Sequence, residues 1–239
     1  AAREPRQAAR ARATVRAWPP RSAAATARET GSPRRTPRAK AAADRLTPRG
    51  GVHPPLTAEA AAAVRRAADR GVRALKLHPP HMGVEPNAYL HGLDALRALY
   101  EVAQRLKLPV MIHTGTSIFP GARSRTGEPM AVDDVAVDFP DLTIILAHGG
   151  RPLWMEQALF LIRRFPRVYM DVSSIPPRRL PHYFPRLAEF ADKVLYGSDW
   201  PPPGVRRLGH GLREFMALDL PEDVKRKLVQ DNPERLFPL

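Results

Sequence analysis

Short apolar runs that end in a polar or charged side chain recur through residues 72–199 of the 239-residue chain. Val-Met-Ile precedes His113, and Val-Leu-Tyr precedes a Gly-Ser-Asp segment that ends at Asp199. Such runs are typical of buried parallel strands that present a polar group at their carboxyl ends. Strands are therefore predicted at residues 72–78, 110–114, 141–148, 168–173 and 193–199.

Stretches with apolar residues at helical spacing separate these strands. Helices are predicted at residues 58–70, 90–106, 130–139, 153–165, 180–191, 212–218 and 221–229, with a helical turn at 231–237. The polar strand ends lie 35, 35, 23 and 28 residues apart, at His78, His113, His148, Asp171 and Asp199. Right-handed βα crossovers bring such ends to one edge of a sheet. The pattern predicts an α/β fold of the (β/α)8 TIM-barrel type, with its chemistry at one rim.

Alternation along the strands predicts which side chains face the inside of the barrel. If His113 faces inward, Met111 does so too. If His148 faces inward, Ile144 and Leu146 are expected on the inside with it.

The formal net charge of +14 is concentrated in one segment. Residues 1–50 hold 13 of the 38 Lys and Arg residues against three acidic residues, a local charge of +10, and the rest of the chain carries +4. Large apolar side chains are rare there, so burial cannot offset the entropy of ordering. We predict a disordered, low-complexity segment at 1–50 and a barrel domain at 51–239.

Three interpretations of residues 1–50 stay open. A nucleic-acid-binding arm would interleave aromatic residues with the arginines, but Trp18 is the only aromatic residue there. A transit-like segment would be Arg-rich and acid-poor, but prolines interrupt any helix. The abrupt change of composition near Gly50 and the missing initiator Met favour a wrong reading frame or a truncation. Nucleic acid is therefore not expected as a partner.

The chain contains no cysteine. This excludes disulfides and thiolate metal sites and leaves His, Asp and Glu as the strong metal ligands. No apolar run is long enough to span a bilayer. We expect a cytoplasmic protein without a membrane partner.

Two imidazoles and a carboxylate, those of His113, His148 and Asp199, are predicted to meet at the rim. This donor set suits a divalent metal ion, most of all Zn²⁺, with Mn²⁺ or Fe²⁺ as alternatives. Asp199 can ligate the metal and exchange a proton with an attacking water, and His148 can ligate the metal or orient that water. The competing interpretation is that these are buried histidines bonded to the backbone. For Asp171 and Ser173, both a role in supporting the site and a role in catalysis stay open.

Other polar residues near the strand ends are candidates for substrate binding. Lys76 and His78 end the first predicted strand, and Arg151 and Trp200 follow the ends of later ones. A lysine at such a position pairs with a carboxylate or a substrate anion. Arginines after strand ends also favour an anionic small-molecule substrate.

Four segments together resemble the amidohydrolase superfamily, and its family 2 branch in particular. They are VMIHTG at 110–115, IILAHGG at 144–150, VLYGSDWP at 194–201 and NPERLF at 232–237. The resemblance covers residue 52 to the end and implies a metal-dependent hydrolase or a nonoxidative decarboxylase. It also implies that His113 is the metal ligand of the fifth strand. On the same basis His148 holds metal-bound water or substrate, and Asp199 ligates the metal and transfers protons.

The family's first strand carries a His-x-His pair that supplies two metal ligands, and no His-x-His occurs in this sequence. The five predicted strands correspond to the fourth to the eighth of the family, so the barrel is predicted to be incomplete. Open strand edges favour pairing with a partner, such as a second copy in a homodimer.

The leading functional prediction is metal-activated hydrolysis of an amide, ester or lactone in a carboxylated substrate. A metal-dependent decarboxylase is the alternative, and release of carbon dioxide without water consumption would distinguish it. An inactive truncated homologue, or a binding protein whose basic segment engages nucleic acid, is a further alternative. Steep salt dependence of nucleic-acid binding would support the binding protein.

Overall fold

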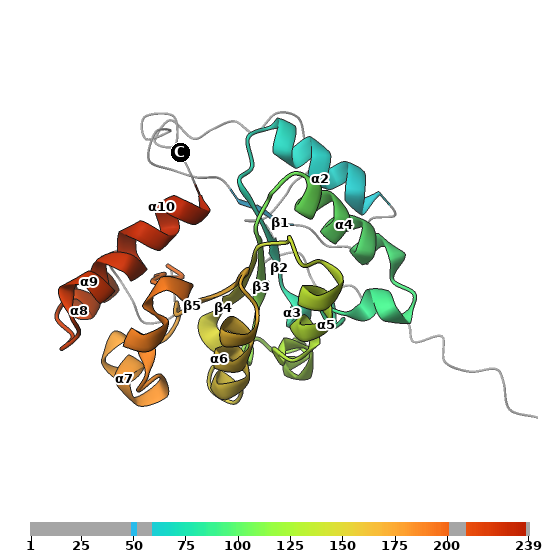
Figure 1. Cartoon of the computed structure of the whole chain (residues 1–239). Coiled ribbons are helices and arrows are strands. Elements are labelled where there is room, and N and C mark those ends of the chain that lie inside the picture. The colour runs from blue at the N-terminus through green and yellow to red at the C-terminus, as the bar shows by residue number, and fades with distance from the viewer. Residues whose placement is uncertain (1–48, 52–58, 201–208, 238–239) are drawn as a thin grey trace, which may run out of the picture. The chain divides into compact units, whose positions relative to one another are not determined.

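Six parallel strands form one sheet in the order β1-β2-β3-β4-β5-β6 (Figure 1). This computed structural model describes residues 49–51, 59–200 and 209–237, with the backbone alone for 49–51, and all of them belong to a compact unit at 35–239. The strands are β1 (Arg49–Gly51), β2 (Ala74–Leu77), β3 (Val110–His113), β4 (Ile144–Ala147), β5 (Val168–Asp171) and β6 (Val194–Leu195).

Helices follow the strands in alternation and line one side of the sheet in strand order (Figure 1). They are α2 (Ala60–Asp69), α3 (Pro79–Met82), α4 (Asp94–Arg105), α5 (Ala131–Asp138), α6 (Met155–Arg164), α7 (Leu180–Tyr183), α8 (His210–Met216), α9 (Glu222–Arg226) and α10 (Asn232–Leu236). Short 3₁₀ turns lie at Ala88–His91, Ser124–Gly127, His148–Gly150, Pro177–Arg179 and Leu187–Lys193, and a π turn at Lys227–Asp231.

The predicted α/β fold is confirmed, and the first strand adds to it. β1 is an Arg-Gly-Gly segment without an apolar pattern, and its pairing with β2 alone defines it. The expectation of disorder for residues 1–50 falls on 1–48 outside the described residues. Within the described residues β1 and β6 are the two edges of the sheet, in line with the predicted incomplete barrel.

The two faces of the sheet carry separate apolar clusters. On the outer face, side chains such as Leu75, Ile112 and Leu146 pack with the helices. The inner face carries a smaller cluster, which consists of Ala74, Met111, Ile145, Ala147, Leu195 and Phe237. Met111 therefore faces inward, as predicted.

The predicted inward orientation of Ile144 and Leu146 is wrong. Both side chains belong to the outer cluster, and Ile145 and Ala147 belong to the inner one. The prediction assumed that the alternation of β4 continues through His148. Because His148 has a φ of +68°, the strand ends at Ala147, and His148 is placed by a left-handed turn instead.

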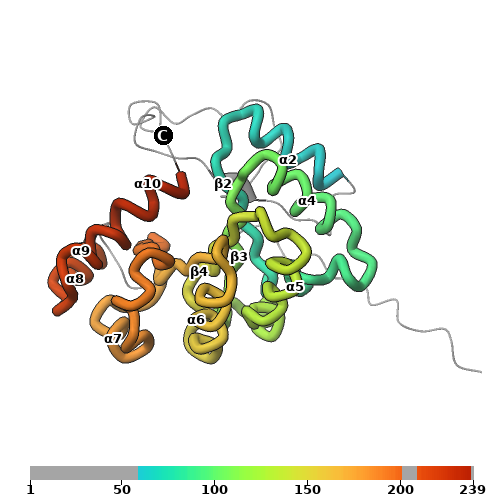
Figure 2. Tube along the Cα trace, viewed as in Figure 1, coloured from blue at the N-terminus to red at the C-terminus, as the bar shows by residue number. Residues whose placement is uncertain are grey.

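The last strand is shorter than the predicted 193–199. The N–H of Tyr196 donates to the carbonyl oxygen of Leu228 at 2.9 Å instead of continuing the ladder with β5. The Asn232 amide donates to the carbonyl oxygens of Ala191 and Val194, both at 2.7 Å. These bonds hold the π turn and α10 beside β6. The trace runs on through α8 and α9 to α10 at its red end (Figure 2).

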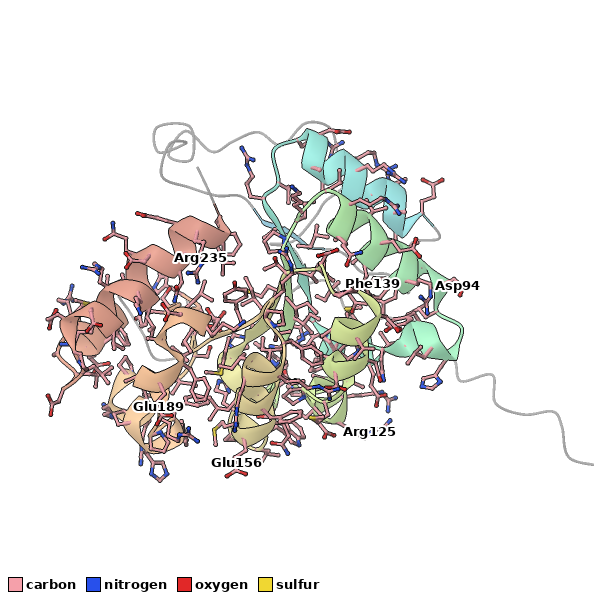
Figure 3. All side chains as sticks on the ribbon, viewed as in Figure 1. Asp94, Arg125, Phe139, Glu156, Glu189 and Arg235 are labelled. Carbon is pink, nitrogen blue, oxygen red and sulfur yellow. The ribbon has the colours of Figure 1, made fainter. Side chains whose placement is uncertain are left out.

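The labelled charged side chains lie on the outside of the helices and turns (Figure 3). Arg125, Glu156 and Glu189 are exposed, whereas Phe139 is buried between the helices and the sheet. No helix in the described part of the chain is both long and apolar enough to cross a bilayer.

Candidate active site

His113 ends β3 and is buried, with 5% of its surface exposed. Neither of its ring nitrogens has a hydrogen-bond partner among the described residues. Burial, followed by the charges of His78 and His148, holds the pKa of His113 far below its ordinary value, so the ring is neutral. A neutral buried imidazole with an unused lone pair is a ready proton acceptor or metal ligand.

His78 stacks on His113, with ring centroids 3.9 Å apart and an angle of 19° between the rings. It stands directly before α3, and its Nδ1 is buried without a partner. Burial, the nearby His81 and then Lys76 lower the pKa of His78 to about 3. His81 is exposed, its ring centroid lies 4.1 Å from that of His78, and its Nε2 lies 3.3 Å from the Ser117 hydroxyl oxygen.

His148 lies beside His113, with ring centroids 4.7 Å apart. It begins a turn in which His148, Gly149 and Gly150 all have positive φ. At Gly149 a Cβ would lie 2.8 Å from Phe184 Cζ and 2.9 Å from Met170 Sδ, so a side chain has no room there. This turn explains the His-Gly-Gly segment, because it holds the imidazole at the carboxyl end of β4.

Asp171 and Ser173 contact His148 from the end of β5, and both are buried. His148 Nδ1 lies 2.9 Å from the Ser173 hydroxyl oxygen and 3.2 Å from the Ser173 carbonyl oxygen. Burial and the charge of Lys76 lower the pKa of His148, against the opposite effects of Asp171 and Asp199. The ring is therefore neutral.

Arg151 and Lys76 bring positive charge to the same rim. The Nε of Arg151 is buried without a partner among the described residues, and burial lowers the pKa of its guanidinium against the effect of Asp199. Lys76 pairs in register with the inward-facing Met111, and its charge lowers the pKa of all three histidines at the site. The rim thus presents cationic groups around neutral imidazoles.

The loops after β3 and β4 are bonded to each other. The hydroxyl of Thr114 donates to the Ala147 carbonyl oxygen at 2.8 Å and accepts the N–H of Gly150 at 3.1 Å. A Cβ at Gly115 would lie 2.2 Å from the Arg151 carbonyl oxygen, so the two loops pack backbone to backbone. The sequence gives no pattern for Thr114, and its role follows only from this contact.

Asp199 and Trp200 are exposed, unlike the buried His113 and His148. Asp199 is exposed, has a φ of +51°, and accepts a hydrogen bond from the Ser174 hydroxyl. Its charge still acts on His148 and Arg151, so the three groups converge on one rim. Trp200 is 47% exposed and is the last described residue before 201–208.

The fit of a divalent metal ion can be tested on these atoms. The two unpartnered nitrogens of His113 suit a metal ligand. However, no group of three or more His, Asp or Glu side chains comes together to hold a metal ion in the described ranges. The described part of the site therefore supplies imidazole donors without a complete ligand set.

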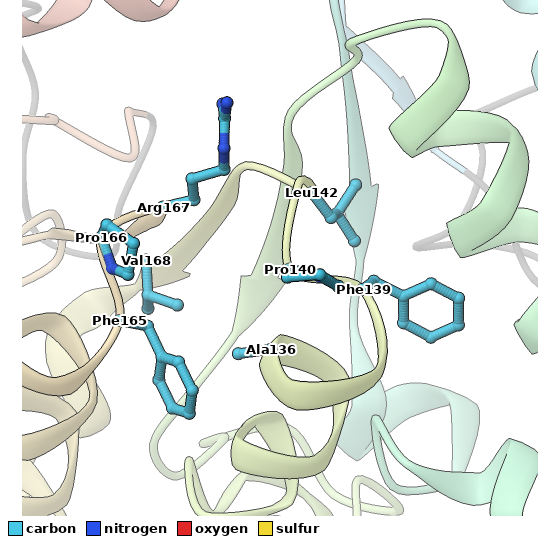
Figure 4. A pocket seen from close by; sticks show the side chains of 8 residues that line it. All are labelled: Ala136, Phe139, Pro140, Leu142, Phe165, Pro166, Arg167 and Val168. Carbon is cyan, nitrogen blue, oxygen red and sulfur yellow. The ribbon is translucent and has the colours of Figure 1, made fainter.

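A separate pocket of about 70 Å³ lies at the opposite end of the sheet (Figure 4). Phe139 and Leu142 line it before β4, and Phe165 and Val168 line it at the start of β5. Ligand sites usually enclose about 300–1,000 Å³. This pocket is too small and too far from the histidines to belong to the site.

A parallel α/β sheet with histidines at the carboxyl ends of its strands defines a class of barrel enzymes whose reactive groups sit at that rim. The amidohydrolase family profile matches residues 4–239, and the chain belongs to this family. The match begins nearer the N-terminus than residue 52, where the motifs first showed the resemblance. The family is generally metal-dependent.

Three known proteins show what the chain is similar to. A 2-pyrone-4,6-dicarboxylate hydrolase of Comamonas testosteroni is 28% identical over 159 residues, which cover 49% of this chain and 51% of the relative. The crystal structure of an uncharacterized TIM-barrel protein from Bordetella bronchiseptica has a TM-score of 0.67 and 26% identity, over 83% of this chain and 68% of the other. That of 5-carboxyvanillate decarboxylase from Sphingomonas paucimobilis has a TM-score of 0.62 and 17% identity, over 84% and 69%.

The similarity to the Comamonas hydrolase thus spans about half of its length. The structural similarity to the decarboxylase shows the shared barrel fold. The superfamily and the fold predicted from the motifs are both confirmed.

Proposed function

We propose that this protein is a hydrolase of the amidohydrolase type that opens an ester, lactone or amide in a carboxylated small molecule. The observation that carries this proposal is the pair of buried, neutral imidazoles of His113 and His148, 4.7 Å apart at the carboxyl ends of β3 and β4. Buried polar groups are costly unless they are bonded, so unpartnered nitrogens on His113 are expected to serve a ligand.

His148 and Asp199 are proposed to move protons. His148 is neutral and can accept a proton from water at Nε2 or orient that water by a hydrogen bond. Asp199 is exposed beside the site and can exchange the proton with the leaving group or with solvent. These two residues are therefore the proposed catalytic groups.

Arg151, Lys76, His78 and Trp200 are proposed to bind the substrate. The Arg151 guanidinium has a desolvated Nε without a partner, which a carboxylate would satisfy in a charge-assisted hydrogen bond. Lys76 adds positive charge on the inner face. His78 provides a flat neutral surface against His113, and Trp200 an exposed ring at the rim.

His113 and Asp199, with His148 either as a further ligand or as the residue that orients the water, are the proposed donors to a divalent metal ion, most of all zinc, with manganese or iron as alternatives. The described residues alone do not complete the ligand set. When bound, such an ion lowers the pKa of a coordinated water to about 7 and polarises a carbonyl group. Elemental analysis of the purified protein tests this assignment. Replacement of His113 by Ala should lower the bound metal, whereas replacement of the exposed His182 should not.

The substrate class is proposed from the charge of the rim and from the Comamonas relative, which is named for 2-pyrone-4,6-dicarboxylate. A dicarboxylated ring with an internal ester would offer anions to Arg151 and Lys76 and a carbonyl carbon to water. The decarboxylase whose fold this chain shares makes carbon dioxide release the second candidate reaction.

Incubation with 2-pyrone-4,6-dicarboxylate tests the proposal. Hydrolysis in ¹⁸O-labelled water should give a ring-opened product that carries the label, without carbon dioxide. Carbon dioxide without incorporation of label would favour the decarboxylase, and no conversion of this or related cyclic esters would refute the hydrolase.

The Arg151→Met variant should raise KM by about 10- to 100-fold, because a charged hydrogen bond to the substrate is lost. Arg163, which is exposed on α6, provides the matched control, and Arg163→Met should leave KM unchanged. Equal KM values in both variants would exclude Arg151 from substrate binding.

A cytoplasmic location and a homodimer stay proposals. The two sheet edges of the described residues support a second copy as partner, because exposed edges tend to be covered. Sedimentation of the purified chain measures the oligomer directly.

A further inference from the structure

The two ring nitrogens of His148 have different surroundings. Its Nδ1 faces two oxygens of one residue, the hydroxyl of Ser173 at 2.9 Å and the carbonyl of Ser173 at 3.2 Å. His148 and Ser173 are each 5% exposed and Asp171 is 6% exposed. Because water has little access, the polar atoms of these three residues must form their hydrogen bonds mainly with one another.

The Ser173 hydroxyl uses its single proton in a hydrogen bond to Asp171. The hydroxyl donates to Asp171 Oδ1, and the same oxygen accepts the backbone N–H of Ser173 at 3.0 Å and that of His148 at 3.4 Å. An ionised carboxylate only accepts hydrogen bonds, so it keeps the hydroxyl proton turned toward itself. The Ser173 hydroxyl oxygen therefore presents a lone pair to His148.

Both groups that face Nδ1 of His148 are consequently acceptors. A lone pair on Nδ1 would meet two other lone pairs in a buried site, whereas an N–H would bond to them. We infer that Asp171 and Ser173 are positioning residues that fix the proton of neutral His148 on Nδ1 and leave the lone pair on Nε2. The catalytic meaning of this tautomer rests on the proposed function, but the tautomer itself does not.

The absence of a side chain at Gly197 allows the backbone after β6 to pack closely on Asp171 and Ser173. A Cβ at residue 197 would lie 2.3 Å from Asp171 Oδ2 and 2.9 Å from Ser173 Cβ. The backbone after β6 thus packs directly on Asp171 and Ser173. The contact limits the movement of the carboxylate and of the hydroxyl.

Nitrogen-15 NMR of the histidine side chains tests the inference. The spectra are recorded above the ordinary imidazole pKa of about 6.5, and the His148 signals are identified by their loss in His148→Gln. The wild-type ring should carry its proton on Nδ1. In Asp171→Ala the freed Ser173 hydroxyl can donate to Nδ1, so the proton should move to Nε2.

The double variant of Asp171→Ala with Ser173→Ala gives the sharpest outcome. It removes the freed donor and leaves only the Ser173 carbonyl oxygen opposite Nδ1, so the Nδ1–H signal should return. A purely structural role of Asp171 does not predict this return. Ser174→Ala is the matched control, because the Ser174 hydroxyl donates to Asp199 and should not affect the His148 tautomer.

A wild-type ring protonated on Nε2, or a double variant that stays protonated on Nε2, would overturn the inference. If Asp171→Ala does not fold, Ser173→Ala alone decides, since loss of one acceptor should let the Nε2–H form appear beside Nδ1–H. An unchanged spectrum of Ser173→Ala would overturn it as well. Turnover of Ser173→Ala should fall by about 10- to 100-fold. Failure of the proposed function would show instead as an inactive wild type with the expected tautomer.

Discussion

The two ends of the sheet differ in how their polar side chains are hydrogen-bonded. Five buried side-chain atoms lack a hydrogen-bond partner in the described part of the chain, and four of them belong to His78, His113 and Arg151 at the carboxyl ends of β2 to β4. At the amino ends, Lys193 donates to the carbonyl oxygens of Phe165 and Pro166 and lies 4.5 Å from the ring centroid of Tyr169.

Backbone conformation follows the same division. Three of the four non-glycine residues with positive φ in the described residues follow strand ends, namely His148, Ser174 and Asp199. Such conformations cost about 1–3 kcal/mol each and persist where the surrounding structure enforces them. The amino ends therefore stabilise the fold, and the carboxyl ends hold unpaired and strained groups that a ligand can use.

Among the substitutions that test this difference between the two ends, replacement of His113 should have the largest effect on turnover. His113→Leu should reduce turnover by about 10²- to 10⁴-fold, since it removes a reactive imidazole. Stability should stay within about 1 kcal/mol of the wild type or rise, because two unpartnered buried nitrogens are replaced by apolar groups. Chemical denaturation together with turnover measures both effects.

Ile112→Val on the outer face of β3 is the matched control for His113. It should cost about 0.5–1.5 kcal/mol of stability and keep turnover. A large loss of stability in His113→Leu would show that this histidine supports the fold and not the reaction.

Glycines at the two ends should differ in their tolerance of a side chain. Gly115→Ala should destabilise the protein by about 3 kcal/mol or more, because its φ of +101° is strained and its Cβ would lie 2.2 Å from the Arg151 carbonyl oxygen. Gly71, before β2, has a φ of +82° with nothing within 4 Å, so Gly71→Ala should cost only about 1–2 kcal/mol, the cost of the left-handed conformation. Equal losses in thermal unfolding would mean that the loops after β3 and β4 can separate freely.

Acidification should lower the free energy of unfolding of the metal-free protein. The folded-state pKa of His78 is about 3 and that of His113 is lowered too, so between about pH 6.5 and pH 3 the unfolded chain binds protons that the folded chain does not. Stability is therefore present above pH 6.5 and falls as the pH decreases through this window.

Each such histidine contributes up to about 1.4 kcal/mol per pH unit. Urea unfolding at a series of pH values should give a shallower slope for His113→Leu than for the wild type. Identical slopes would show that the imidazole is solvated in the folded protein.

The smallest effect is expected at Lys193. Lys193→Met should lose about 1 kcal/mol of stability, since two carbonyl oxygens lose a donor, and turnover should not change. A loss of turnover without a loss of stability would contradict the assignment of the amino ends to stability.

The positions of β2 to β5 and the meeting of His113 with His148 could be predicted from the sequence, because apolar runs with polar ends specify buried parallel strands. Alternation held along β3 and failed at β4, where His148 leaves the strand through a left-handed turn. Nothing in a single sequence reports such a φ value at a histidine. β1 could not be predicted because its residues acquire strand structure only from pairing with β2.

The partners of the site residues were harder to predict than the residues themselves. The contact between Ser173 and His148 joins positions 25 residues apart, and that between His81 and His78 joins two rings across a short helical turn. These contacts depend on loop conformations that follow strand ends. The ligand set of Asp199 with the two histidines stays a prediction for the same reason.

Phe237 belongs to the inner cluster together with Ala74 and Met111. Within the described residues, the inner cluster that begins at β2 is therefore completed only when a segment more than 150 residues further along the chain has left the ribosome. Such distant contacts form late and slowly, and exposed apolar surface is prone to association in the meantime. Any change that removes Phe237 should thus be felt first in the yield of folded protein, before it is felt in the chemistry of the rim.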